Sequence, residues 1–158
     1  MSINGTKHFN QAAVEHSDYA IAHGIDNTLP EEFEGNAQRQ CEFLEEIRSL
    51  LSGQYGQDVK IFPSSFYRGH GLNTAIGGVP TSQHCKGQAT DFHTSIDNLD
   101  EVFEYIEESD LQFDQLIEES DKEGHRWIHA STPDEGVTAR REVLKGEKGQ
   151  RLNRVAVG

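Results

Sequence analysis

The segment Ser82–Asp91 reads Ser-Gln-His-Cys-Lys-Gly-Gln-Ala-Thr-Asp. It holds an imidazole, His84, and a carboxylate, Asp91, with Gly87 between them. A glycine at this point lets the chain turn from a loop into a strand, so that both side chains point inward. Zinc accepts nitrogen and oxygen ligands of these types. The segment therefore predicts two ligands of a metal site.

A third candidate ligand stands in the sequence Trp127-Ile128-His129. We expect residues 126–131 to form another strand, which would bring His129 to the first pair. Two histidines and one aspartate leave one of the four tetrahedral positions of zinc open, and a catalytic zinc requires an open position.

Other histidines compete as ligands. His93 shares a strand face with Asp91 and is an alternative to His129. His125 and His129 would lie on one face of a helix, but Trp127 favours a strand and makes His125 a rim residue. The remaining histidines lack partners at ligand spacing and are expected at the surface or in packing: His8, His16, His23 and His70.

The pattern S-x-H-x-x-G-x-A-x-D with a later W-x-H resembles the zinc D-Ala-D-Ala carboxypeptidase family. This family includes phage and bacterial peptidoglycan peptidases and shares its fold with the Hedgehog signalling domain. Further segments resemble its single-domain phage and bacterial branch, over roughly residues 8–131. They are Ser65-Phe66-Tyr67-Arg68, Leu72-Asn73, Gly77-Gly78, and Phe113-Asp114-Gln115-Leu116-Ile117 with Glu119.

The resemblance implies a zinc-dependent peptidase that cleaves peptidoglycan stem or cross-link peptides, as a D-Ala-D-Ala carboxypeptidase or endopeptidase. One zinc ion would be bound by three ligands: His84, Asp91 and His129. Glu119 would be the catalytic general base. Arg68 would bind a substrate carboxylate, which a planar guanidinium matches with two hydrogen bonds. Ser82 and Gln115 are further substrate-binding candidates.

One residue departs from the family pattern. Some members place the base three residues before the last histidine, where this chain has Arg126. An arginine accepts no proton at working pH. Either Glu119 serves as the base, with Glu118 in reserve, or the site binds zinc without turnover. The alternative function is a non-catalytic wall-binding or virion structural module with the same fold.

The resemblance and the apolar spacing together predict an α+β fold of the Hedgehog and D-Ala-D-Ala peptidase type, with helices on one side of a small, mostly antiparallel sheet. Helices are expected at Asn36–Leu51, capped by Asn36 and closed by Gly53, at Asn98–Glu107, and near Gln11–His16. Strands are expected near residues 59–62, 88–93, 113–119 and 126–131.

Length and charge limit the remaining possibilities. The 158 residues suit a single domain over residues 1–135, followed by an extension, 136–158, with one edge strand near Glu142–Leu144 and a disordered end. The net charge is −13: the first part holds 8 Lys and Arg against 25 Asp and Glu, the extension 6 against 2. An acidic surface repels phosphate, so no nucleic-acid partner is expected.

The two cysteines and the N-terminus bear on the cellular location. Cys41 and Cys85 are expected to be free thiols, with Cys85 directed away from the metal. No apolar run is long enough for a membrane span, and the first residues lack the pattern of a Sec-type signal. We expect action on the cell wall, as a phage lysin or virion component, or alternatively as a bacterial enzyme exported by another route.

Overall fold

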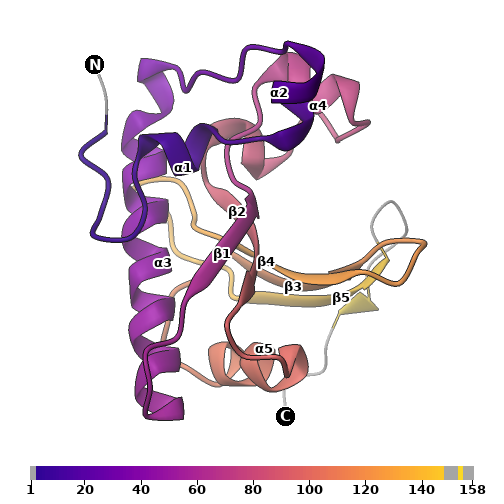
Figure 1. The fold of residues 1–158 in the computed structure, drawn as a ribbon. Coiled ribbons are helices and arrows are strands. Elements are labelled where there is room, and N and C mark those ends of the chain that lie inside the picture. The colour runs from indigo at the N-terminus through magenta and orange to yellow at the C-terminus, as the bar shows by residue number, and fades with distance from the viewer. Residues whose placement is uncertain (1–2, 148–152, 155–158) are drawn as a thin grey trace.

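The computed structural model describes residues 3–147 and 153–154, which form an α+β fold (Figure 1). The helices are α1 (Gln11–Glu15), α2 (Asp18–His23), α3 (Glu34–Tyr55), α4 (His70–Ala75) and α5 (Leu99–Glu107), with the short 3₁₀ turns η1 (Glu31–Phe33) and η2 (Gln83–Lys86). The strands are β1 (Ile61–Ser65), β2 (Ala89–Thr94), β3 (Gln115–Ser120), β4 (Arg126–Ser131), β5 (Glu142–Glu147) and β6 (Asn153–Arg154). The predicted fold class is confirmed.

These strands form one sheet in the order β1-β2-β4-β3-β5-β6. Neighbouring strands are antiparallel except β3 and β5, which are parallel. In the register of β2 and β4, Asp91 lies opposite His129. The sheet therefore brings together two of the three predicted ligands, although 38 positions separate them in the sequence.

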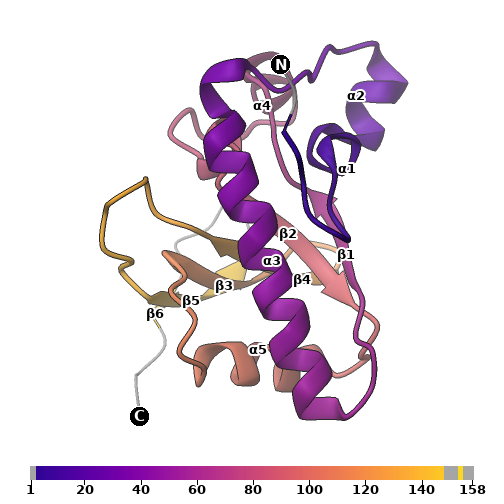
Figure 2. The same cartoon turned by 90° about the vertical axis from the view of Figure 1, so that its left-hand side faces the viewer.

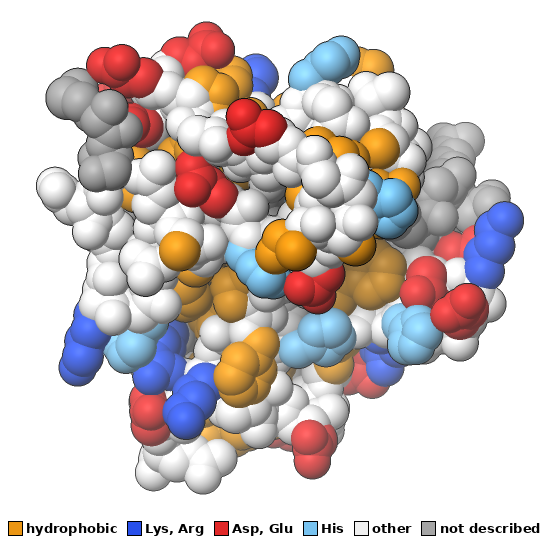
Figure 3. Space-filling model, turned by 45° about the horizontal axis from the view of Figure 1, so that its top comes forward, with side chains coloured by type: hydrophobic (Ala, Val, Ile, Leu, Met, Phe, Trp, Pro, Cys, Tyr) orange, Lys and Arg blue, Asp and Glu red, His pale blue; other side chains and the backbone are white. Residues whose placement is uncertain are grey.

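Helices α3 and α5 pack against the same face of the sheet (Figures 1 and 2). Ile128 and Ala130 of β4 belong to the hydrophobic core on that side. His129 lies between them and, because strand side chains alternate, points to the other face. Figure 3 views the molecule with the top of Figure 1 brought forward. Histidine and hydrophobic side chains lie near the middle of the surface in this view. The candidate site therefore lies away from the two packed helices.

Helix α3 is longer than predicted at both ends. The helix begins at Glu34, directly after η1, so the expected cap, Asn36, lies inside it. The side chain of Asn36 caps no helix; its Nδ2 donates to the carbonyl oxygen of Lys86 at 3.1 Å. The expected last glycine, Gly53, also lies inside. The helix ends at Gly56, where φ is 63°. A glycine ends a helix where the chain enters the left-handed region, and Gly53 keeps the helical backbone.

Strand β1 covers Ile61–Ser65 rather than residues 59–62. Val59 is bound to helix α3 instead of the sheet, because its carbonyl oxygen accepts a hydrogen bond from Arg48. Pro63 has no backbone N–H to donate to a neighbouring strand. It fits within β1 because β1 lies at the edge of the sheet, where one side of the strand has no neighbour to receive a hydrogen bond.

The chain beyond β4 continues into the sheet. Strand β5 occupies the region in which an edge strand is expected, and it pairs with β3 on one side and β6 on the other. The division at residue 135 stays a prediction. The disorder expected at the end of the chain concerns residues 148–152 and 155–158, which lie outside the described residues. Within the described part, no helix has the length and hydropathy needed to cross a bilayer.

Candidate metal centre

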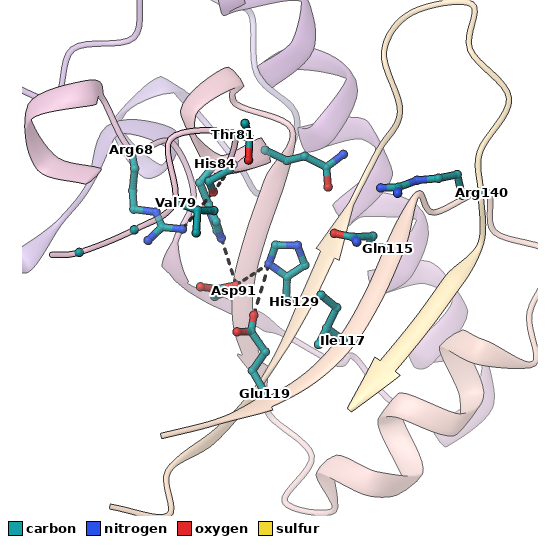
Figure 4. Close-up of a pocket in the computed structure, with 14 residues that line it drawn as sticks. Arg68, Val79, Thr81, His84, Asp91, Gln115, Ile117, Glu119, His129 and Arg140 are labelled. Carbon is teal, nitrogen blue, oxygen red and sulfur yellow. Dashed lines mark hydrogen bonds and ion pairs between the residues drawn. The ribbon is translucent and has the colours of Figure 1, made fainter. Parts of the chain in front are cut away.

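Three side chains, His84, Asp91 and His129, converge on the open face of the sheet (Figure 4). His84 lies in η2, where the Ser82 hydroxyl accepts a hydrogen bond from the His84 backbone N–H. Gly87 ends this turn with a φ of 73° and leads into β2. A residue with a side chain would be strained in this conformation. The glycine of the sequence motif is thus what lets the turn and the strand present their ligands together.

The distances within the group are those of interacting atoms. Nε2 of His84 lies 3.2 Å and Nδ1 of His129 lies 3.0 Å from Oδ1 of Asp91. His84 also donates from Nδ1 to the carbonyl oxygen of Phe66 at 2.7 Å, which leaves the Nε2 lone pair facing the carboxylate. A lone pair and a carboxylate repel each other unless a cation or a proton lies between them. Two nitrogens and one oxygen so arranged fit a zinc ion.

The buried surroundings set the charge of each ligand. Burial lowers the pKa of His84, which keeps the imidazole neutral, as a metal ligand must be. Burial alone would raise the pKa of Asp91, but the hydrogen bond and the charge of His129 hold it below its usual range. Burial is the largest single influence on His129 and opposes its charge, but the hydrogen bond and the charge of Asp91, together with the charge of Glu119, outweigh burial and raise the pKa. The ionised carboxylate therefore attracts positive charge into the group.

Two neighbouring carboxylates of β3 face opposite ways. Oε1 of Glu119 lies 3.6 Å from Nδ1 of His129, beside the metal group. Glu118 points to the other face, where it pairs with Arg126 and, at 3.5 Å, with Lys145. Alternation along the strand separates the two side chains, so only Glu119 of this pair lies beside the group.

Arg126, at the position where some family members carry the base, points away from the group. It stands three residues before His129 on β4, and an odd separation puts two strand residues on opposite faces. Its guanidinium binds Asp100 and Glu118. A base at this position of β4 would face the wrong side, which is consistent with a base from β3.

The competing ligands lie elsewhere. The exposed Nε2 of His93 donates to the carbonyl oxygen of Arg126 at 2.8 Å. His125 pairs at 2.8 Å with Asp121, and these two with Glu123 form an exposed acidic group at the turn between β3 and β4. Cys41 and Cys85 are free thiols, as predicted.

The metal group lies in a cavity of about 470 Å³. Arg68 lies on one side of the group, and Gln115 and Arg140 lie on the other (Figure 4). Arg68 is buried, and its Nη2 donates to Oγ of Ser82 at 3.3 Å. The cavity thus contains all the predicted catalytic and substrate-binding residues: Arg68, Ser82, Gln115 and Glu119.

Sequence reasoning missed several lining residues, among them Arg140. Its Nη2 donates to Oδ2 of Asp114 at 2.7 Å, a contact between segments 26 residues apart that no local spacing predicts. Asp114 gave a usable signal, because a carboxylate directly after the apolar Phe113, at the start of a predicted buried strand, needs a cationic partner. The other lining residues that were not predicted as part of the site are Gly77, Gly78, Val79, Thr81, Gln83 and Ile117.

The model of the family described as Peptidase M15 matches residues 7–131, which include the whole metal group and Glu119. Among curated proteins, none matches the chain. The match covers most of the chain, so the chain belongs to the Peptidase M15 family. This confirms the resemblance seen in the sequence and implies a metallopeptidase of a zinc-dependent family, with a buried His-Asp-His group that could bind the metal.

Proposed function

We propose that this member of the Peptidase M15 family is a zinc peptidase that hydrolyses peptide bonds in the stem or cross-link peptides of peptidoglycan, with action on the cell wall. The observation that carries the proposal is the convergence of three buried ligand atoms on the floor of a cavity, with one carboxylate beside them. The peptidoglycan substrate rests on the family resemblance. The hydrolytic chemistry rests on the residues.

His84, Asp91 and His129 would hold the zinc ion. The chemistry that zinc supplies when bound is polarisation of the scissile carbonyl and acidification of a water molecule. The protein contributes a fixed set of ligands, since the Phe66 carbonyl oxygen orients the His84 ring and the pairing of β2 with β4 sets Asp91 against His129.

Glu119 would act as the general base. Its carboxylate accepts a proton from the attacking water and then gives that proton to the amine that leaves. One oxygen of Glu119 lies 3.6 Å from a ligand nitrogen, so the carboxylate is within reach of a water molecule at the metal group. Glu119 would thus be needed for turnover but not for zinc binding.

Arg68 would hold the carboxylate of the leaving residue. Its side chain is bound to Ser82 at one nitrogen, and its Nε is buried without a hydrogen-bond partner among the described residues. A guanidinium fixed in this way is ready to form two hydrogen bonds with a carboxylate. Ser82 would support Arg68, and Gln115 would contact the substrate on the other side of the metal group.

Mass spectrometry of defined muropeptides tests this function. We expect the zinc-loaded protein to release a terminal D-residue or to split a cross-linked dimer, and the metal-stripped protein to do neither. Glu119→Gln should lose at least about a hundredfold in rate while keeping its zinc. Glu118→Gln is the matched control, because its carboxylate lies on the opposite face, and it should cleave like the parent.

Two results would contradict the proposal. Cleavage by Glu119→Gln at the parental rate would remove Glu119 from the mechanism. No cleavage by the parent with one zinc bound per chain would favour the non-catalytic module.

A further inference from the structure

The segment before β5 supplies a second arginine to the cavity of the metal group. Arg140 lines this cavity, although it lies beyond residues 7–131, which the family model matches. It lies on the side of the metal group opposite Arg68 (Figure 4). In the proposed function Arg68 holds the leaving residue of the substrate. The peptide on the acyl side of the scissile bond would therefore run from the metal group toward Arg140.

The guanidinium of Arg140 is fixed from behind. Its Nε and Nη2 donate to the two carboxylate oxygens of Asp114 at 3.1 and 2.7 Å. Asp114 is buried and does not line the cavity, whereas the Arg140 side chain is 55% exposed. Nη1 lies 4.0 Å from Oε1 of Glu142, which is beyond hydrogen-bond distance. Nη1 is therefore the part of the guanidinium that can donate to a ligand in the cavity.

The charges of the cavity favour an anion on this side. Its charged lining residues, apart from the histidines, are two arginines and two carboxylates: Arg68, Arg140, Asp91 and Glu119. They balance one another, so a divalent zinc ion would make the cavity positive in a chain whose net charge is −13. The carboxylate expected at Arg68 neutralises only part of this charge. A substrate with a further carboxylate on the acyl side would complement the rest.

We infer that Arg140 determines specificity on the acyl side of the substrate, by binding a carboxylate carried one or two residues before the residue whose carbonyl is attacked. The inference rests on the proposed function. Peptidoglycan stem peptides offer this chemistry in two places: a glutamate linked through its side chain and a diamino acid with a second carboxylate. The acyl-side peptide is the same whether the leaving residue ends a stem or belongs to a cross-link, so the inference holds for both.

Two pairs of peptides ending in D-Ala-D-Ala test the inference. In the first pair, the residue before this dipeptide is L-glutamate or L-glutamine. In the second it is L-alanine, preceded by a γ-linked D-glutamate whose α-carboxyl group is free or amidated. Each pair exchanges a carboxylate for a carboxamide of the same size. We expect kcat/KM to favour the acid by about fivefold or more in one pair, which then identifies the position of the carboxylate.

Two neighbouring arginines provide matched variants. Arg140→Gln should abolish the preference for the acid. Arg141→Gln removes a guanidinium from the same segment that binds backbone carbonyl oxygens and does not line the cavity, and it should keep the preference. The preference is a ratio of two rates of one enzyme preparation. A variant that merely unfolds in part lowers both rates together and leaves the ratio unchanged.

The outcomes separate this inference from the proposed function. Cleavage without a preference for the acid in either pair would overturn the inference alone, as would a preference that Arg140→Gln retains. Failure to cleave these peptides and cross-linked muropeptides would count against the proposed function. Calorimetry of the zinc-loaded protein with the acyl-side products, which end in the first D-alanine, would then decide: equal affinities for acid and amide in both pairs would overturn the inference.

Discussion

At the scale of single residues, the metal group depends on one oxygen atom. Oδ1 of Asp91 contacts both imidazoles, His84 at 3.2 Å and His129 at 3.0 Å. The remaining side chains of the site are arranged around this atom: Glu119 next to one imidazole and Arg68 on the far side of the other. The roles proposed for Glu119 and Arg68 rest on these positions, and each can be tested separately.

Arg68 should be responsible for any preference for a free carboxylate on the leaving residue. We expect the parent to cleave a peptide ending in D-Ala-D-Ala at least about tenfold faster, in kcat/KM, than its C-terminal amide. Arg68→Gln should lose most of this preference. Arg141→Gln is the control: its guanidinium donates to the carbonyl oxygens of Leu111, Glu107 and Ser109 instead. An unchanged preference in Arg68→Gln would refute the assignment.

At the scale of elements, two glycines of α3 should respond oppositely to the same substitution. A Cβ added at Gly53 or Gly56 would meet no neighbouring group within 4 Å, so steric contact does not distinguish the two substitutions. The backbone does: Gly53 has a helical conformation, whereas Gly56 has a φ of 63°. Gly53→Ala should therefore raise the free energy of unfolding by about 0.4–1 kcal/mol. Gly56→Ala should lower it by about 1 kcal/mol. Urea unfolding measures the free energy of both variants. If both substitutions change it in the same direction, the helix does not end at Gly56 as described.

The elements that could be predicted are those with a regular apolar spacing. Helix α5 is one example, since Val102, Phe103 and Ile106 are buried as the spacing requires and Asn98 accepts the capping hydrogen bond from the Glu101 N–H. Helices α2 and α4 were not predicted. Helices of six residues have little stability alone and depend on tertiary contacts.

One such contact lies at the start of α4, where the backbone N–H of Gly69 donates to Oδ1 of Asn27 at 2.7 Å. These two residues are 42 positions apart, so the sequence around Gly69 carries no signal for it. The metal ligands could be predicted because one short motif holds two of them.

At the scale of the whole molecule, Arg140 and Asp114 bind the C-terminal segment to the sheet. Hydrogen bonds from Arg140 hold the pKa of the largely buried Asp114 below its usual range. A lowered carboxyl pKa contributes stability above the unfolded pKa, about 3.9, and that stability is lost as the pH falls toward the folded value. We expect the parent to lose more stability between pH 6 and about pH 3 than Asp114→Asn.

Urea unfolding at several pH values measures this difference. Arg140→Gln removes the cationic partner of Asp114 and leaves the carboxyl group in place. This variant should also lose less free energy of unfolding than the parent as the pH falls. Parallel profiles for the parent and both variants would show that this ion pair does not contribute to acid stability.

The central claim, a zinc ion held by His84, Asp91 and His129, is tested most directly by zinc X-ray absorption on the purified protein with its metal content measured. We expect one zinc per chain with two imidazole nitrogens at about 2.0–2.1 Å, further ligands that are oxygens, and no sulfur. His129→Ala should lose one imidazole from the spectrum. Scattering from sulfur at about 2.3 Å, or a protein that retains no zinc, would contradict the assignment.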